Sequence, residues 1–89
     1  MAIKKELEII NQRGLHARAA SKLVNVVKKY KSVVTVSKND QKVTGSSILG
    51  VMMLAAGLGD KIIFEITGED EQESFEAIKI LVNNKFDEY

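Results

Sequence analysis

The feature that most constrains the fold of this 89-residue chain is a change in the spacing of its apolar residues. Apolar side chains alternate at period two over residues 3–9, which predicts a strand. From Ala20 to Tyr30 they recur at helical spacing, which predicts an amphipathic helix beginning near His16 or Ala17. Because the two periods suit different secondary structures, their alternation along the chain indicates the order of its elements.

The remaining elements follow from runs of β-branched residues, turn residues and helix caps. They are a strand over 33–37, a return strand over 41–44, a helix between Ser47 and Gly57, a strand over 61–67, and a helix from Asp70 to Asn83. Asp70 and Glu73 have the spacing of a capping box, in which each side chain bonds the other residue's backbone N–H.

The predicted order is β-α-β-β-α-β-α, within one domain over residues 1–89. Three helices of this length can cover one face of a four-stranded antiparallel sheet, so we expect an open-faced two-layer β-sandwich of the α/β (α+β) class. The right-handed crossover rule favours a split βαβ arrangement, with the first and last strands paired at or near the centre of the sheet.

Charge and composition exclude several classes of protein. The 13 basic and 12 acidic side chains give a net charge of +1, which argues against a nucleic-acid binder that relies on bulk charge. The sequence has no cysteine and no signal-like N-terminus, and it has no apolar run of the roughly 18 residues that a membrane span needs. We therefore expect a cytoplasmic protein without membrane insertion.

The only histidine, His16, lies in the segment 14–20 (GLHARAA), where the first strand gives way to the first helix. Gly14 permits a tight turn into the helix. The first amides of the helix, at Ala17 and Arg18, are unpaired donors for an anion, and the Arg18 guanidinium matches phosphoryl oxygens. These neighbours turn a weak signal into a predicted phosphoryl site.

The sequence lacks the residues that a metal site, a hydrolase triad or a nucleotide site would require. A metal site would need further nitrogen or thiolate ligands, and the chain has no second histidine and no cysteine, so no metal or cofactor is expected. Nothing in the pattern places a nucleophile and a buried acid beside His16, as a hydrolase triad requires. No phosphate-binding loop of the nucleotide type occurs. The phosphoryl group must therefore come from another protein.

The segment 14–20 and the later segment 47–52 (SILGVM) resemble, at their observed separation, the HPr family of histidine-containing phosphocarriers of the bacterial phosphotransferase system. The resemblance covers essentially the whole chain. It implies that His16 is phosphorylated on Nδ1 by enzyme I, charged from phosphoenolpyruvate, and passes the group to an enzyme IIA. It further implies that Arg18 helps hold the group, and that the protein is a carrier rather than an enzyme.

Ala19 departs from the commonest family pattern, which has proline after the arginine. Proline suits the first helical turn because its ring presets φ. Alanine is also a good helix former and adds a backbone N–H, so we expect the helix to form. The departure bears on the rigidity of the loop and leaves the nucleophile in place.

Ser47 has two compatible interpretations. Locally it predicts a helix N-cap. The resemblance implies a regulatory phosphorylation site for an HPr kinase/phosphorylase, and the helix dipole would tolerate the added charge. Ser46 is the adjacent alternative.

The apolar run after Ser47 predicts either a buried helix or an exposed docking surface. We expect a partner-docking patch made of Leu15, Ser21, Ile48, Leu49 and Met52, on a protein that is a monomer. Residues 86–89 receive no function.

Two alternatives stay open at this point. The first is a regulatory interaction module, of a nitrogen-type or serine-phosphorylated kind, that acts by binding rather than by carrying phosphate to a transporter. The second is a small acyl-phosphate hydrolase on a similar sandwich, which would need an arginine–asparagine pair that the sequence does not place.

Overall fold

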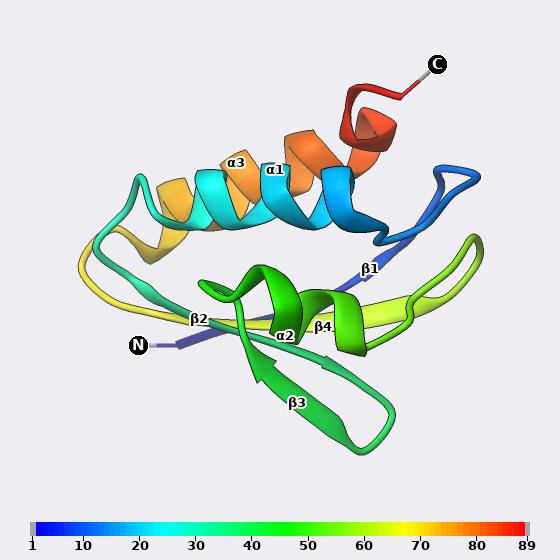
Figure 1. Cartoon of the computed structure of the whole chain (residues 1–89). Coiled ribbons are helices and arrows are strands. Elements are labelled where there is room, and N and C mark those ends of the chain that lie inside the picture. Colours follow the sequence, from blue (N-terminus) through cyan, green and yellow to red (C-terminus); the bar gives the residue numbers. More distant parts are fainter. Residues whose placement is uncertain (1, 89) are drawn as a thin grey trace.

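The computed structural model describes residues 2–88, so Met1 and Tyr89 lie outside the described residues. Its elements follow the predicted order (Figure 1). They are β1 (Ala2–Glu8), α1 (Ala17–Val27), β2 (Val33–Lys38), β3 (Gln41–Thr44), α2 (Ile48–Met53), β4 (Lys61–Thr67), α3 (Glu71–Asn83) and a short terminal turn, η1 (Lys85–Asp87).

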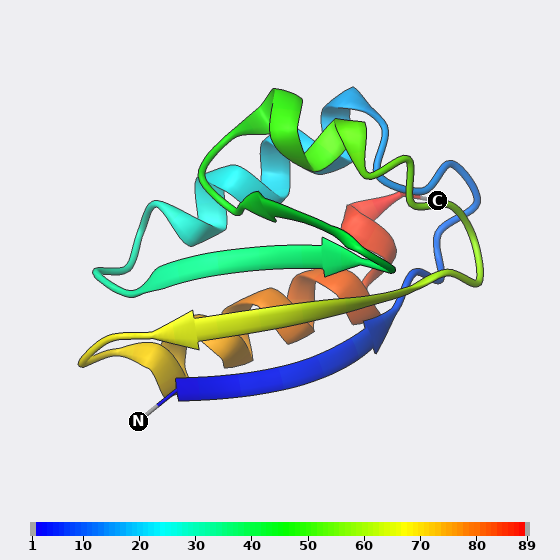
Figure 2. The same cartoon turned by 90° about the horizontal axis from the view of Figure 1, so that it is seen from below.

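The four strands form one antiparallel sheet in the order β1-β4-β2-β3 (Figure 2). β4 pairs with β1 on one side and with β2 on the other, so β1 and β2 run parallel with β4 between them. All three helices lie on one side of the sheet (Figure 1). The predicted open-faced two-layer fold and its split βαβ arrangement are confirmed.

The predicted central position of the first strand is wrong. β1 pairs with the last strand as expected, but it lies at the edge of the sheet. The β2–β3 hairpin takes the other side of β4, which leaves β1 without a second neighbour. The charged side chains of Lys4, Lys5 and Glu6 are exposed on β1, and such charges protect an edge strand from pairing with other chains.

The core lies between the sheet and the helices. Ile62, Phe64 and Ile66 project from β4 with no exposed surface, as their alternation predicts. Leu23 and Ile78 cover them from α1 and α3 with none exposed either. Burial of this kind stabilises by about 25 cal/mol for each Å² of apolar surface removed from water. The helix–sheet interface therefore holds the start of α1 in place.

α2 ends earlier than the sequence predicts. Its last residue is Met53, whereas Gly57 was the expected stop. Ala55 has φ 52°, in the left-handed region that closes a helix, and its N–H bonds the Met52 carbonyl at 3.0 Å. Ala55 occupies a position at which glycine is usual, so its residue type does not indicate that the helix ends there.

The predicted capping box at the start of α3 is also wrong. Asp70 is the N-cap residue but does not cap its own helix. Its carboxylate instead accepts hydrogen bonds from the backbone N–H groups of Lys31, at 2.8 Å, and Ser32, at 2.9 Å, and from the Ser32 hydroxyl. These bonds, that of the hydroxyl foremost, hold the pKa of Asp70 below its ordinary value of 3.8. Asp70 thus ties the start of α3 to the approach to β2.

Candidate functional site

His16 is the N-cap residue of α1 and has extended backbone angles, φ −71° and ψ 179°. Its carbonyl accepts the first helical bond, from the N–H of Ala20 at 2.8 Å. Its side chain makes no capping bond and is 19 % exposed. The imidazole therefore lies at the start of the helix but does not accept a hydrogen bond from its first amides.

The first three amides of α1 belong to Ala17, Arg18 and Ala19. Among residues 2–88 these amides have no hydrogen-bond acceptor. Unpaired amides at a helix start carry partial positive charge and bind anions. The predicted anion-binding backbone at Ala17 and Arg18 is thus present beside His16, and Ala19 adds a third N–H.

Gly14 makes the approach to this helix possible. It has φ +65°, and a Cβ there would lie 2.4 Å from the Ala56 carbonyl oxygen and 2.8 Å from the Gly57 Cα. Asn11, which is 1 % exposed, braces the turn by donating from Nδ2 to the Gly14 carbonyl at 2.9 Å. The neighbouring N–H of Leu15 bonds Ala56 O at 2.9 Å. These bonds fix the backbone at Gly14 and Leu15, directly before His16.

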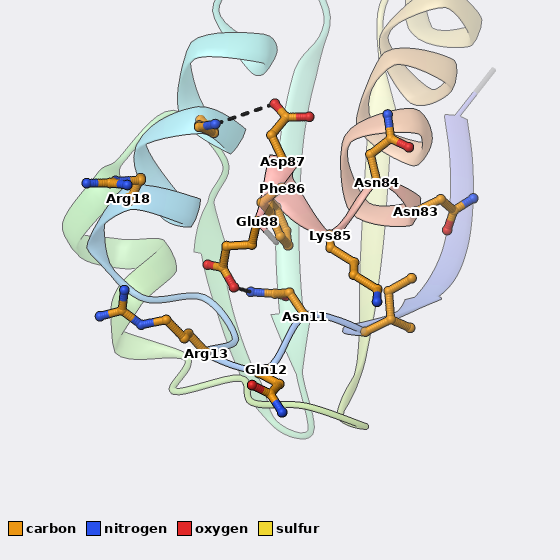
Figure 3. A pocket seen from close by; sticks show the side chains of 12 residues that line it. Asn11, Gln12, Arg13, Arg18, Asn83, Asn84, Lys85, Phe86, Asp87 and Glu88 are labelled. Atoms are coloured by element: carbon orange, nitrogen blue, oxygen red, sulfur yellow. Dashed lines mark hydrogen bonds and ion pairs between the residues drawn. The ribbon is translucent and has the colours of Figure 1, made fainter.

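Arg18 lies on the exposed side of the first turn. It forms no hydrogen bond or ion pair with another residue of the described chain, so its guanidinium has its donors available. Figure 3 shows its side chain extending away from Glu88.

The side chain of Glu88 lies against His16, although 72 residues separate the two in sequence. One carboxylate oxygen bonds His16 Nε2. The other accepts from Asn11 Nδ2 at 3.2 Å, a bond that Figure 3 shows. The hydrogen bond with His16 is the main cause that lowers the pKa of Glu88 below its ordinary value of 4.5. Glu88 is therefore an ionised partner of the histidine at neutral pH.

A cavity of about 860 Å³ opens beside these residues (Figure 3). Its walls come from the loop after β1, from the outer face of α1 and from the segment 83–88. Arg13, Arg18 and Lys22 bring positive charge to it, and Glu88 forms part of its lining. The cavity therefore adjoins the Glu88 carboxylate that contacts His16.

Ser47 is the N-cap of α2, as predicted, and its Oγ accepts from the Gly50 N–H at 3.0 Å. Its side chain is half-buried, whereas Ser46 is exposed. The Ser46 hydroxyl pairs with Thr44 Oγ1 at 3.0 Å.

The predicted docking patch is divided by the structure. Ile48, Leu49 and Met52 are exposed by 41 %, 68 % and 36 %, and Met53, which the prediction left out, by 65 %. Ser21 is half-buried. Leu15 does not belong to the patch: it is 4 % exposed and packs in the core, because its backbone is drawn inward by the bond to Ala56.

Asn11 and Glu88 are the site residues that the sequence analysis missed. Asn11 sits in a turn, where asparagine is common, and its burial is a product of the folded loop. Glu88 belongs to a segment without a motif, and only the folded chain brings it to His16. Within residues 2–88, no group of acidic, histidine or cysteine side chains could hold a metal ion, and no helix is long and apolar enough to cross a membrane.

A family model described as the PTS HPr component phosphorylation site matches residues 3–84. The phosphocarrier protein HPr of Neisseria meningitidis is 48 % identical over 86 residues, which cover 97 % of each chain. The phosphocarrier protein NPr of Shewanella violacea is 36 % identical over 97 % of this chain and 94 % of that protein.

Among solved structures, that of HPr-C-His from Thermoanaerobacter tengcongensis superposes with a TM-score of 0.93 at 36 % identity, over 98 % of each chain. The match of the family model, the identities over nearly the full length and the shared fold agree with one another. The chain belongs to the HPr family, the phosphocarrier proteins of the phosphotransferase system.

Proposed function

We propose that this chain carries a phosphoryl group on Nδ1 of His16, between enzyme I as donor and an enzyme IIA as acceptor. The observation that carries the proposal is the open start of α1. Three amides without an acceptor in the described chain lie beside a histidine whose other ring nitrogen, Nε2, is already bonded. In an HPr-family chain this is where a phosphoryl group would be held.

The transfer is an exchange of bonds at phosphorus. The Nδ1 lone pair of His16 forms the new N–P bond while the bond from phosphorus to the donor breaks, and the reverse displacement delivers the group to the acceptor. The amides of Ala17 and Arg18 and the Arg18 guanidinium would stabilise the charge on the phosphoryl oxygens. The protein is regenerated in each cycle, which makes it a carrier rather than a catalyst in the usual sense.

Incubation with enzyme I and phosphoenolpyruvate tests this proposal. We expect an acid-labile adduct of one phosphate on the wild-type chain and none on His16→Ala. An adduct that persists in His16→Ala would refute the assignment of the phosphorylated residue.

The exposed side chains of Ile48, Leu49 and Met52 support a second element of the proposal, a docking surface for both partner proteins. α2 packs against α1 on the same side of the sheet, which allows one partner to contact this patch and the start of α1 (Figures 1 and 2). Leu49→Glu should weaken binding to enzyme I in titration calorimetry, while Ile80→Glu, an equally exposed site on α3, should leave it unchanged.

We further propose that Ser47 is a regulatory phosphorylation site for an HPr kinase/phosphorylase. The half-buried hydroxyl at the start of α2 adjoins the exposed Ile48 and Leu49, so a phosphate there would place charge on the docking surface. Incubation with the kinase and ATP should phosphorylate the wild type and Ser46→Ala but not Ser47→Ala. If the kinase instead phosphorylated Ser47→Ala and not Ser46→Ala, the modified residue would be Ser46.

The NPr relative supports a second candidate function, in which the acceptor is regulatory rather than part of a sugar transporter. Transfer rates from the phosphorylated chain to a sugar-type and to a nitrogen-type enzyme IIA distinguish the two. A cytoplasmic location and a monomeric state stay predictions, which fractionation and sedimentation equilibrium can test.

A further inference from the structure

The segment that ends at Glu88 is held in an unusual conformation. Lys85, Phe86 and Asp87 have φ values of 57°, 53° and 61°, although none of them is glycine. Left-handed backbone costs about 1–2 kcal/mol per residue for ordinary amino acids. Three such residues in a row persist only where other contacts hold them.

Three contacts hold this turn. The Phe86 side chain is 1 % exposed and belongs to the core. Asp87 pairs with Lys22 Nζ on α1 at 3.4 Å, and the N–H of Glu88 bonds the Lys85 carbonyl at 3.0 Å. The turn reverses the chain after α3 and delivers the Glu88 side chain to His16.

The carboxylate of Glu88 joins the histidine to the loop that carries it. One oxygen bonds His16 Nε2, and the other bonds Asn11 Nδ2. The Asn11 amide is buried and also holds the Gly14 carbonyl. These bonds therefore fix the orientation of the imidazole relative to the start of α1, in addition to the rotamer preference of His16 itself.

The ionisation of Glu88 determines which nitrogen of His16 is free. An ionised carboxylate can only accept a hydrogen bond, so Nε2 must be the nitrogen that carries the proton. In a neutral imidazole the other nitrogen, Nδ1, then has the lone pair. Nδ1 is the atom to which the proposed function assigns the phosphoryl group.

We propose that Glu88 is a positioning residue for His16: it fixes the Nε2–H tautomer and stabilises the positive ring that forms when Nδ1 takes the phosphoryl group. The inference rests on the proposed function. As the N–P bond forms, the bond to the donor breaks, no proton moves, and the ring gains a positive charge shared with Nε2–H. That charge faces the Glu88 carboxylate, as in enzymes where a buried aspartate orients a histidine.

The tautomer is tested without any partner protein, by the ¹⁵N chemical shifts of the imidazole nitrogens of the neutral ring. We expect a single Nε2–H tautomer in the wild type and in Glu88→Gln, which keeps an acceptor oxygen, and a mixture of tautomers in Glu88→Ala. Glu73→Ala is the matched control, because it removes an exposed carboxylate from α3, outside the turn that delivers Glu88.

The rate of phosphorylation by enzyme I tests whether the Glu88 carboxylate stabilises the positive charge of the ring. Loss of a carboxylate that orients a metal-ligating histidine costs a factor of about 10–100, and by analogy we expect about tenfold slower transfer in Glu88→Ala. Glu88→Gln should be slowed comparably, since it keeps the tautomer but lacks the charge. Glu73→Ala should transfer at the wild-type rate, and circular dichroism should show that all three variants are folded.

A Glu88→Ala variant that keeps one tautomer and transfers at the wild-type rate would overturn the role of Glu88 and leave the proposed function intact. Wild-type rates in Glu88→Gln would overturn the stabilisation of the ring charge. Failure of the wild type to be phosphorylated on His16 would instead refute the proposed function, whatever the tautomer.

Discussion

The starts of α1 and α2 differ in how their backbone amides are used. At α2 the Ser47 hydroxyl accepts from the Gly50 N–H, so the side chain of the N-cap residue itself supplies the cap. At α1 the cap residue is His16, whose side chain turns to Glu88 and leaves the amides of the first turn unfilled. The cap residue bonds one amide of the first turn at α2 and none at α1, where the first turn stays open to an anion.

This difference indicates where stability and function are located. A capped helix start contributes about 1 kcal/mol to folding. An open start lacks that contribution, but its amides keep their capacity to bind the oxygens of a ligand. Substitutions at Gly14, Arg18 and Ser47 each alter one of these two helix starts, so their effects on stability and on phosphoryl transfer should differ.

The largest effect is expected at Gly14, which shapes the open start. Gly14→Ala combines a left-handed φ with a contact of 2.4 Å to a backbone oxygen, so unfolding in urea should show a loss of about 3 kcal/mol. Gly59→Ala is the control, because Gly59 also has positive φ, at +88°, but has no atom within 4 Å of its Cβ position. The control should lose only about 1 kcal/mol. Equal losses would mean that the packing against Ala56 is unimportant.

Arg18→Ala should slow phosphoryl transfer about hundredfold, the typical effect of removing one donor to a developing negative charge. Stability should hardly change, because Arg18 is exposed. Lys29→Ala removes the same charge from the turn that follows the end of α1 and should transfer at the wild-type rate. If both variants are slowed alike in stopped-flow assays, the effect is one of overall charge and not of the open start.

Ser47→Ala should have the opposite profile. Loss of the cap should cost about 1 kcal/mol of unfolding free energy, with an unchanged rate of phosphorylation at His16. Ser46→Ala, on the exposed neighbour, should leave both quantities near the wild-type values. Loss of transfer in Ser47→Ala would break the contrast between the two helix starts.

The smallest expected effect concerns pH and Asp70. Its pKa is lowered by bonds from Ser32 and Lys31, so its contribution to stability is full above its unfolded value of about 3.8 and is lost as pH falls through the lower folded value. The difference in unfolding free energy between wild type and Asp70→Asn should therefore be constant near neutral pH and narrow in acid. A difference that widens in acid would contradict the bonding assigned to Asp70.

Much of the fold could be predicted from local patterns. Period-two alternation identified the face of β4, and helical spacing identified the buried side of α1. The position of β1 and the end of α2 at Ala55 could not be predicted, because the first depends on which strands compete for β4 and the second on an alanine in a glycine conformation. Asp70 has the sequence pattern of a helix cap, but its carboxylate accepts hydrogen bonds from the backbone of Lys31 and Ser32 instead.

The candidate site also has a part that could be predicted from the sequence and a part that could not. His16, Arg18 and the free amides are contiguous in sequence, so their juxtaposition was predictable. The burial of Leu15 follows from a bond to Ala56, and the approach of Glu88 follows from the reversal of the chain after α3. Both depend on contacts between distant segments, which local spacing does not encode.

The most direct measurement is a ¹H–¹⁵N spectrum of the chain before and after phosphorylation by enzyme I, with the phosphorylated ring nitrogen assigned by its coupling to phosphorus. We expect phosphorus on Nδ1 of His16 and large shifts for the amides of Ala17 and Arg18, with the Gly50 amide unchanged. Phosphorus at another atom, or amides at the start of α1 that do not shift, would contradict the proposed function.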